Sequence, residues 1–316
     1  MIFSKFPIPP IQSINNMNKR FTPTFVLVFL SYFASAQNYI DLAKFDYAAS
    51  SINSFDTGTA TTPLIEMNAE ITAPIAINKK YTFLPGITYE NTKASFDPGR
   101  KEESLTGLTL KLGINAVHNE KWSGTYLLLP KISSDLEETN TRDFQLGAVV
   151  LMKKTNSQRL NYKYGVYVNS DIFGPLIVPI FGLYYLNKSE KFEAKLLLPF
   201  AADFNYKVNN NFRYGLTFKG QVRTYNLNTP INNISNNYIA RSTNETYLYV
   251  QYGLKNGVNF QLGLGRSIGR SYRMFYERVN FSLPLVYFGD ERKQLNTDFS
   301  DSWLLKGTVF YRLNLE

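Results

Sequence analysis

Apolar and polar side chains alternate along the last segment of the chain. The apolar face consists of Trp303, Leu305, Gly307, Val309, Tyr311, Leu313 and Leu315, and the opposite face of Lys306, Thr308, Phe310, Arg312 and Asn314. A period of two indicates a β-strand whose two faces meet different surroundings. In a soluble sandwich the polar face meets water, whereas in an outer-membrane barrel it lines a lumen and the apolar face meets lipid.

The same alternation recurs along most of the chain. The clearest apolar faces run over Ile65–Ile71, Leu108–Ala116, Leu160–Val168, Phe212–Phe218 and Val258–Leu264. A tilted strand needs roughly 9–11 residues to cross a bilayer, and these segments approach that length. They predict several similar strands in one sheet.

Short polar turns alternate with longer connections between these segments. The short turns are expected at 78–80, 119–121, 155–157, 188–190, 209–211 and 255–257, and the long connections at 51–62, 93–103, 133–141, 226–244 and 279–302. Outer-membrane barrels have short turns at one end and long loops at the other, whereas a sandwich has no reason to keep this order. Aromatic residues also cluster beside the short turns, as rings do at a membrane interface.

Composition agrees with a barrel. The mean hydropathy of −0.22 is too low for a helical membrane protein, but it suits strands that bring only every second side chain to lipid. We therefore predict an all-β fold: a single antiparallel up-and-down transmembrane β-barrel of about 12–14 strands over residues 37–316. The count is open at 192–206, where either Phe192–Leu198 and Phe200–Tyr206 form a short hairpin bent at Pro199 or the turn order breaks.

The first 36 residues have the three parts of a secretory signal peptide. A basic start at Lys19 and Arg20 precedes an apolar run, and Ala34-Ser35-Ala36 precedes Gln37. The apolar run is shorter than the roughly 20 residues needed to span a membrane. We expect cleavage after Ala36. Residues 1–16 fit neither part, so Met17 is the expected start.

The sequence offers few groups for catalysis or metal binding. It has no cysteine and one histidine, His118, which is expected at a short turn as a solvated side chain. Asp135, Glu137 and Glu138 could hold calcium, but an acidic loop in water is the favoured interpretation. The net charge of +9 is scattered, so nucleic-acid binding is not expected. We predict no enzyme activity, no metal and no cofactor.

The polar faces of the strands are the remaining candidate site. Alternation assigns to the lumen Lys111, Lys163, Lys195, Arg213, Lys219, Arg223, Lys306 and Arg312, together with Asp46, Glu66, Glu70 and Glu193. One interpretation is a cation-lined passage that favours anions. The other is a narrow, plugged interior in which these charges pair with one another.

Several motifs resemble those of uncharacterised outer-membrane β-barrel proteins of Bacteroidota, a family with a domain of unknown function. They are the Ala-Ser-Ala site before Gln37, the run Leu196–Pro199 before a Tyr-containing strand, and the ending Phe310-Tyr311-Arg312-Leu313. The resemblance covers roughly 40–316, and the chain ends in Glu316 rather than in a terminal aromatic residue. It implies an outer-membrane location and supplies no substrate or catalytic residue.

Three hypotheses follow. The first is an outer-membrane barrel that is structural or a narrow passive channel for small, anionic solutes. Its partners would be outer-membrane lipid and the barrel-assembly machinery, with the oligomeric state open. The second is an outer-membrane lipid-modifying enzyme with His118 as its only imidazole. The third is a periplasmic β-barrel binding protein.

Overall fold

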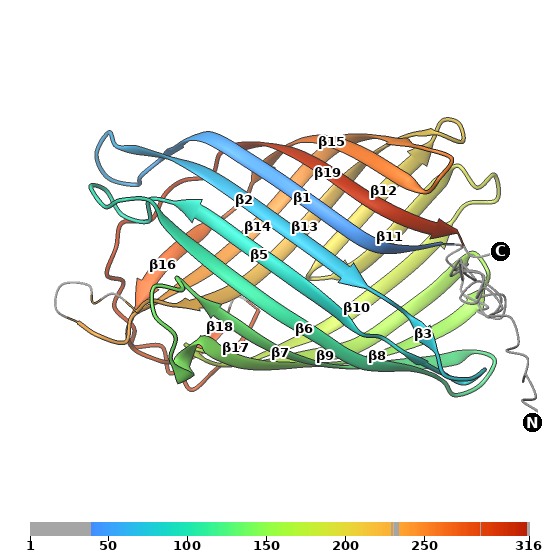
Figure 1. Cartoon of the computed structure of the whole chain (residues 1–316), viewed down its shortest axis with the longest axis horizontal. Coiled ribbons are helices and arrows are strands. Elements are labelled where there is room, and N and C mark those ends of the chain that lie inside the picture. Colours follow the sequence, from blue (N-terminus) through green and yellow to red (C-terminus); the bar gives the residue numbers. More distant parts are fainter. Residues whose placement is uncertain (1–38, 229, 231–233, 285, 315–316) are drawn as a thin grey trace, which may run out of the picture.

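The computed structural model describes residues 39–314 apart from 229, 231–233 and 285. Within that part the chain forms one closed antiparallel barrel of 14 strands (Figure 1), which confirms the predicted fold class and the upper end of the predicted count. The expected signal peptide lies outside the described residues, and the division at residue 36 stays a prediction. No helix among the described residues is long and apolar enough to cross a membrane.

The strands follow one another with little intervening structure apart from the 3₁₀ turn η1 (Thr141–Asp143). They are β1 (Tyr39–Ser54), β2 (Thr61–Thr72), β3 (Ile75–Ala76), β4 (Tyr81–Phe83), β5 (Gly86–Ala94), β6 (Glu103–Val117), β7 (Trp122–Ser134), β8 (Phe144–Ser157), β9 (Leu160–Asp171), β10 (Gly174–Leu186), β11 (Phe192–Leu198), β12 (Ala201–Lys207), β13 (Phe212–Asn226), β14 (Tyr238–Gly253), β15 (Val258–Ser267), β16 (Ser271–Phe275), β17 (Phe281–Leu283), β18 (Val286–Phe288) and β19 (Trp303–Asn314).

Three of the 14 barrel strands are each built from two pieces. β4 continues into β5 because both pair with β6, and β15 continues into β16 because both pair with β14. β2 continues into β3 because β2 pairs with β5 and β3 with β4, the two pieces of the next strand. Pro74 and Pro85 lie at two of the breaks, where a missing N–H interrupts the ladder. β19 pairs with both β1 and β15, which closes the barrel. β17 and β18 form an additional hairpin at the long-loop end.

Strand alternation leaves large apolar side chains on the outside of the barrel. In β14 and β15, Leu248 is 68% exposed and Leu262 is 56% exposed, and many other outward apolar side chains are also exposed. Soluble monomers rarely expose contiguous apolar patches larger than a few hundred Å². The outer surface is therefore of the kind that lipid covers.

Five of the six predicted short turns are confirmed, and the one expected at 155–157 lies at 158–159 because β8 runs on to Ser157. The short turns lie together at the right-hand end of Figure 1. Four of them are closed in the same way by an asparagine. Its side-chain oxygen accepts two consecutive backbone N–H groups, two and three residues ahead in three of the turns, as in an Asx turn, and four and five residues ahead in the turn of Asn187. These asparagines are Asn78, Asn119, Asn187 and Asn209.

The region of uncertain count is a short hairpin, as one of the two alternatives predicted. β11 and β12 have 7 residues each, whereas their neighbours β10 and β13 have 13 and 15. β10 pairs with β11 only from Phe181 onward. β13 follows β12 as far as Gly220, whose N–H donates to the Phe200 carbonyl at 2.8 Å. Beyond this hairpin both long strands lose their partner in the wall.

Past Gly220, β13 turns into the barrel. Its end reaches β7 across the mouth, where Asn226 pairs with Ser134 and the Ser133 hydroxyl donates to the Thr224 carbonyl at 2.6 Å. The first half of β14 and then β16 pair onto it from one side. We call residues 221–226, 238–244 and 271–275 the internal sheet, and it closes the long-loop end of the barrel.

Both faces of the internal sheet are packed. One face contributes Tyr225, Ile239 and Tyr272 to a core against β2, β5 and β6, and the other packs Val222, Ala240 and Tyr238 towards the inner surfaces of β9 and β10. The predicted long connection 226–244 was therefore too long, because β14 begins at Tyr238. A strand buried on both faces loses the polar–apolar alternation from which its position was inferred.

Prolines lie on the part of β10 that has no wall partner. The N–H of Leu186 donates to the Arg159 carbonyl just before β9 and that of Asn187 to the Phe192 carbonyl of β11, so odd-numbered N–H groups along β10 point to the β11 side. Two of these odd positions beyond the hairpin are Pro175 and Pro179, which have no N–H to satisfy. β17 pairs with this edge in parallel at Leu176.

Candidate functional site

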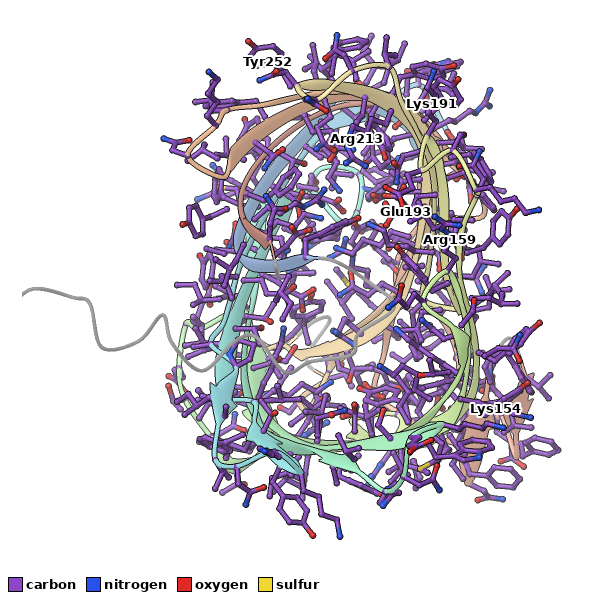
Figure 2. The ribbon with its side chains drawn as sticks, turned by 90° about the vertical axis from the view of Figure 1, so that its right-hand side faces the viewer. Lys154, Arg159, Lys191, Glu193, Arg213 and Tyr252 are labelled. Atoms are coloured by element: carbon purple, nitrogen blue, oxygen red, sulfur yellow. The ribbon has the colours of Figure 1, made fainter. Side chains whose placement is uncertain are left out.

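A cavity of about 540 Å³ lies inside the barrel below the internal sheet. Inward residues of β1, β2, β13, β15 and β19 line one side, and those of β7 to β12 line the other. Figure 2 views the barrel from the short-turn end, where Arg213 and Glu193 project into the lumen. The volume is in the range of small-molecule sites, roughly 300–1,000 Å³.

The β7–β11 side of the cavity is mainly apolar. Cross-strand register places Leu127 opposite Val149 and Val149 opposite Tyr167, all facing inward. Leu151, Ile180, Leu197 and Phe200 extend this surface towards the short hairpin. We call these seven residues the apolar wall.

The opposite side is charged, and its central group is Asp46. The Asp46 carboxylate lies 3.5 Å from the Lys44 ammonium and 3.7 Å from that of Lys306, and it accepts the Thr308 hydroxyl at 2.7 Å. Over the whole cavity, five cations face three acids. They are Lys44, Lys131, Lys219, Arg223 and Lys306 against Asp46, Glu70 and Asp203.

The predicted lumen cations lie on the inner side of their strands, and six of the eight are in ion pairs. The pairs are Lys111–Glu70, Lys195–Glu193, Arg213–Glu193, Arg223–Glu90, Lys306–Asp46 and Arg312–Asp41. Lys163 and Lys219 form no ion pair within the described residues. Of the predicted set, Asp46, Glu70, Lys219, Arg223 and Lys306 line the cavity. Their role in a passage stays a prediction.

Glu66 holds the internal sheet rather than the cavity. Its carboxylate lies 2.6 Å from the Arg241 guanidinium and accepts the Tyr272 hydroxyl at 3.0 Å, while Arg241 also donates to Thr92. Arg241 is 5% exposed. Glu90 binds Gln221 and Arg223 of the same sheet in a similar way. Polar anchors from β2 and β5 therefore fix the sheet across the mouth.

A second anchor lies in the loop that follows the internal sheet. The Arg292 guanidinium donates to both oxygens of Asp290 and lies over the rings of Phe173, Phe275 and Tyr287. The hydrogen bonds from Arg292 lower the pKa of the Asp290 carboxyl from its usual value. The pair keeps the loop closed over the ends of β10 and β16.

Sequence reasoning missed several residues of these sites, among them Asp203 on β12. Lys44, Lys131 and Glu90 face inward, and the alternation of their own strands would have found them. Arg241 lies in what was expected to be a loop, so no alternation was there to assign it. The signal available was a charged residue among Tyr238, Ile239 and Ala240, a mixture unusual for an exposed loop.

The other sequence candidates lie away from the cavity. His118 lies at the exposed turn after β6, with its Nε2 3.1 Å from the Tyr126 hydroxyl. In the acidic loop, Asp135 accepts hydrogen bonds from the Asn228 backbone and side chain. Across the described ranges, no three His, Cys, Asp or Glu side chains are grouped so that they could hold a metal.

Comparisons with solved structures return barrels of the outer membrane. The COG4313 outer membrane channel from Pseudomonas putida F1 is 8% identical, with a TM-score of 0.44 over 87% of this chain and 95% of that one. The toluene transporter TodX from Pseudomonas putida is 9% identical, with a TM-score of 0.36 over 87% and 89%. The NanC porin is 7% identical, with a TM-score of 0.35 over 86% and 100%.

No curated protein matches the chain in sequence. A family model described as "Domain of unknown function (DUF6268)" matches residues 34–283. That match spans well over half of the chain and includes every strand from β1 to β17. The chain therefore belongs to the DUF6268 family.

Proposed function

We propose that the protein is an outer-membrane β-barrel that forms a narrow passive channel for small anionic solutes. The observation that carries the proposal is a cavity with five cations and three acids inside a closed barrel whose outer surface is apolar. A surplus of like charge along a passage sets its ion preference. The paired charges and the internal sheet support a narrow passage rather than a wide pore.

The aromatic residues beside the short turns support the membrane location. Tyr81, Tyr162, Tyr185 and Tyr206 are exposed on the outside near that end, and the Tyr206 and Tyr214 rings lie 5.6 Å apart. Tyrosine is enriched where a protein crosses the membrane–water interface. Cleavage after Ala36, insertion by barrel-assembly machinery and an origin in Bacteroidota remain predictions from the sequence.

The membrane location predicts a large difference between two adjacent substitutions in β15. Leu262→Arg places a charge on the outer face near the middle of the strand, where lipid contact makes it cost about 2–4 kcal/mol of unfolding free energy. Gln261→Arg points into the cavity and should cost much less. Urea unfolding in lipid vesicles, followed by tryptophan fluorescence, measures both. Equal values for the two variants would contradict a lipid-facing surface.

The channel is tested by recording from planar bilayers across a KCl gradient. We expect small current steps whose reversal potential shows anion preference. Replacing Lys219 and Lys306 together by glutamine should weaken that preference, because both line the cavity. Arg159→Gln, at an exposed pair with Glu190, is the control and should leave it unchanged. Cation preference, or the absence of steps from folded, inserted protein, would refute the proposal.

A further inference from the structure

The apolar wall has a cation at each end. Towards the mouth, Lys131 follows Leu127 and Leu129 on the inner face of β7. Towards the short turns, Lys153 and Lys163 are register partners directly below Leu151. The wall between them is four strands wide from β7 to β10, and Leu197 continues it on β11. A surface of this shape fits an elongated apolar body with a charged end.

Lys131 is a buried cation without a direct counter-charge. It is 6% exposed, and it forms no ion pair or hydrogen bond within the described residues. Of the nearby carboxylates, Glu90 binds Gln221 and Arg223. Asp171 accepts the Thr224 hydroxyl through Oδ1 and its Oδ2 has no hydrogen-bond partner among the described residues, but it forms no ion pair with Lys131. Burying an ammonium without a partner is costly, so an anion that entered the cavity would gain from meeting it.

Across the cavity, Lys219 is in a similar position. It is partly buried, lines the cavity and has no acid within ion-pair distance in the described part of the chain. The three acids that line the cavity are already in contact with donors: Asp46 with Lys44, Glu70 with Lys111, and Asp203 with the Tyr249 hydroxyl. Lys131 and Lys219 therefore face the cavity without an acid in ion-pair contact, whereas each acid of the cavity already has a hydrogen-bond or ion-pair partner.

From this arrangement we infer that the cavity binds an amphipathic organic anion. Its acidic group would lie at Lys131 and its hydrocarbon or aromatic body along the apolar wall, with Lys219 as a further cation across the cavity. The inference names the substrate class of the proposed channel and rests on that function for its physiological meaning. The binding site itself follows from the cavity alone, so the two can fail separately.

The test is binding of radiolabelled laurate to the folded barrel in lipid nanodiscs. Partition into lipid rises linearly with concentration, so empty nanodiscs give the background and a saturable component reports the site. We expect one saturable site for laurate. Dodecylammonium has the same chain length with the opposite charge, and we expect no saturable binding of it.

Matched variants locate the site. Val149→Trp fills the apolar wall and should weaken laurate binding at least about tenfold, whereas Val150→Trp, the next residue, points to the outside and should not. Lys131→Gln should also weaken binding about tenfold through loss of the charge-assisted contact. Arg159→Gln removes a cation at the exposed β8–β9 turn, away from the cavity, and should have no effect. Lys131→Gln removes an unpaired buried charge, so it is expected to fold.

Three results would overturn the inference: no saturable laurate site on folded protein, equal affinity for dodecylammonium, or unchanged binding in Val149→Trp. None of these alters the current steps expected in bilayers. Conversely, laurate binding with the expected variant effects, but without any current steps, would retain the site and reject the channel.

Discussion

Arg241→Ala is expected to lower the free energy of unfolding by about 3–5 kcal/mol, since it leaves a buried carboxylate without its partner. The Glu66 carboxylate lies 2.6 Å from the Arg241 guanidinium; the Arg241 side chain is 6% exposed and that of Glu66 is 13% exposed. Loss of this anchor should also free the internal sheet from β2. Chemical unfolding in detergent measures the loss of stability. Recording from planar bilayers tests the release of the internal sheet, which should give larger current steps.

The control for Arg241→Ala is Arg159→Ala, which breaks the ion pair with Glu190 at the exposed β8–β9 turn. Exposed pairs contribute roughly 0–1 kcal/mol, so unfolding should change little. Glu66→Gln keeps the shape of the partner while removing its charge, and it should reproduce most of the Arg241→Ala effect. If the two arginine variants unfolded alike, the internal sheet would not depend on this pair.

Gly220→Ala is the second substitution with a large expected effect. A Cβ added at Gly220 would lie 2.6 Å from the Pro199 carbonyl oxygen, which is backbone and cannot rotate away. Overpacking of this kind costs about 1–3 kcal/mol, occasionally more. It would also separate β13 from the short hairpin at the point where β13 turns inward. Thermal unfolding of the purified barrel, read by band shift on gels, measures the loss.

Gly307→Ala provides the comparison for Gly220→Ala. Gly307 also lies in a strand of the barrel, but a Cβ there would meet no atom within 4 Å. We expect its unfolding temperature to match that of the unsubstituted protein. A similar fall in both variants would show that glycine matters for strand propensity and not for the close approach to Pro199.

Much of the barrel could be predicted from the sequence because the outer face of each strand requires apolar side chains, so every second residue is apolar. Leu108 to Ile114 in β6 show this well, since every second residue is apolar and exposed. The order of short and long connections could be predicted because polar turn residues separate the alternating segments. The inward direction of Lys306 and Arg312 needed only the alternation of the last strand.

The internal sheet could not be predicted in this way. Its residues pack on both faces, so Val222 and Tyr225 are both shielded although they point in opposite directions. Its position depends on contacts between distant strands, such as Arg241 with Glu66, which lie 175 residues apart. The pairing of the lumen charges was likewise one of two open alternatives, because alternation gives a direction but not a distance.

The prolines on β10 bear on how the barrel behaves beside other chains. A strand that has lost its neighbour normally offers a row of N–H groups that a foreign strand can pair with. Pro175 and Pro179 have no N–H to donate. Between them, β17 pairs with the edge at Leu176. The interrupted wall is therefore protected against edge-to-edge association, and a break in the sheet can persist in a crowded membrane without seeding aggregates.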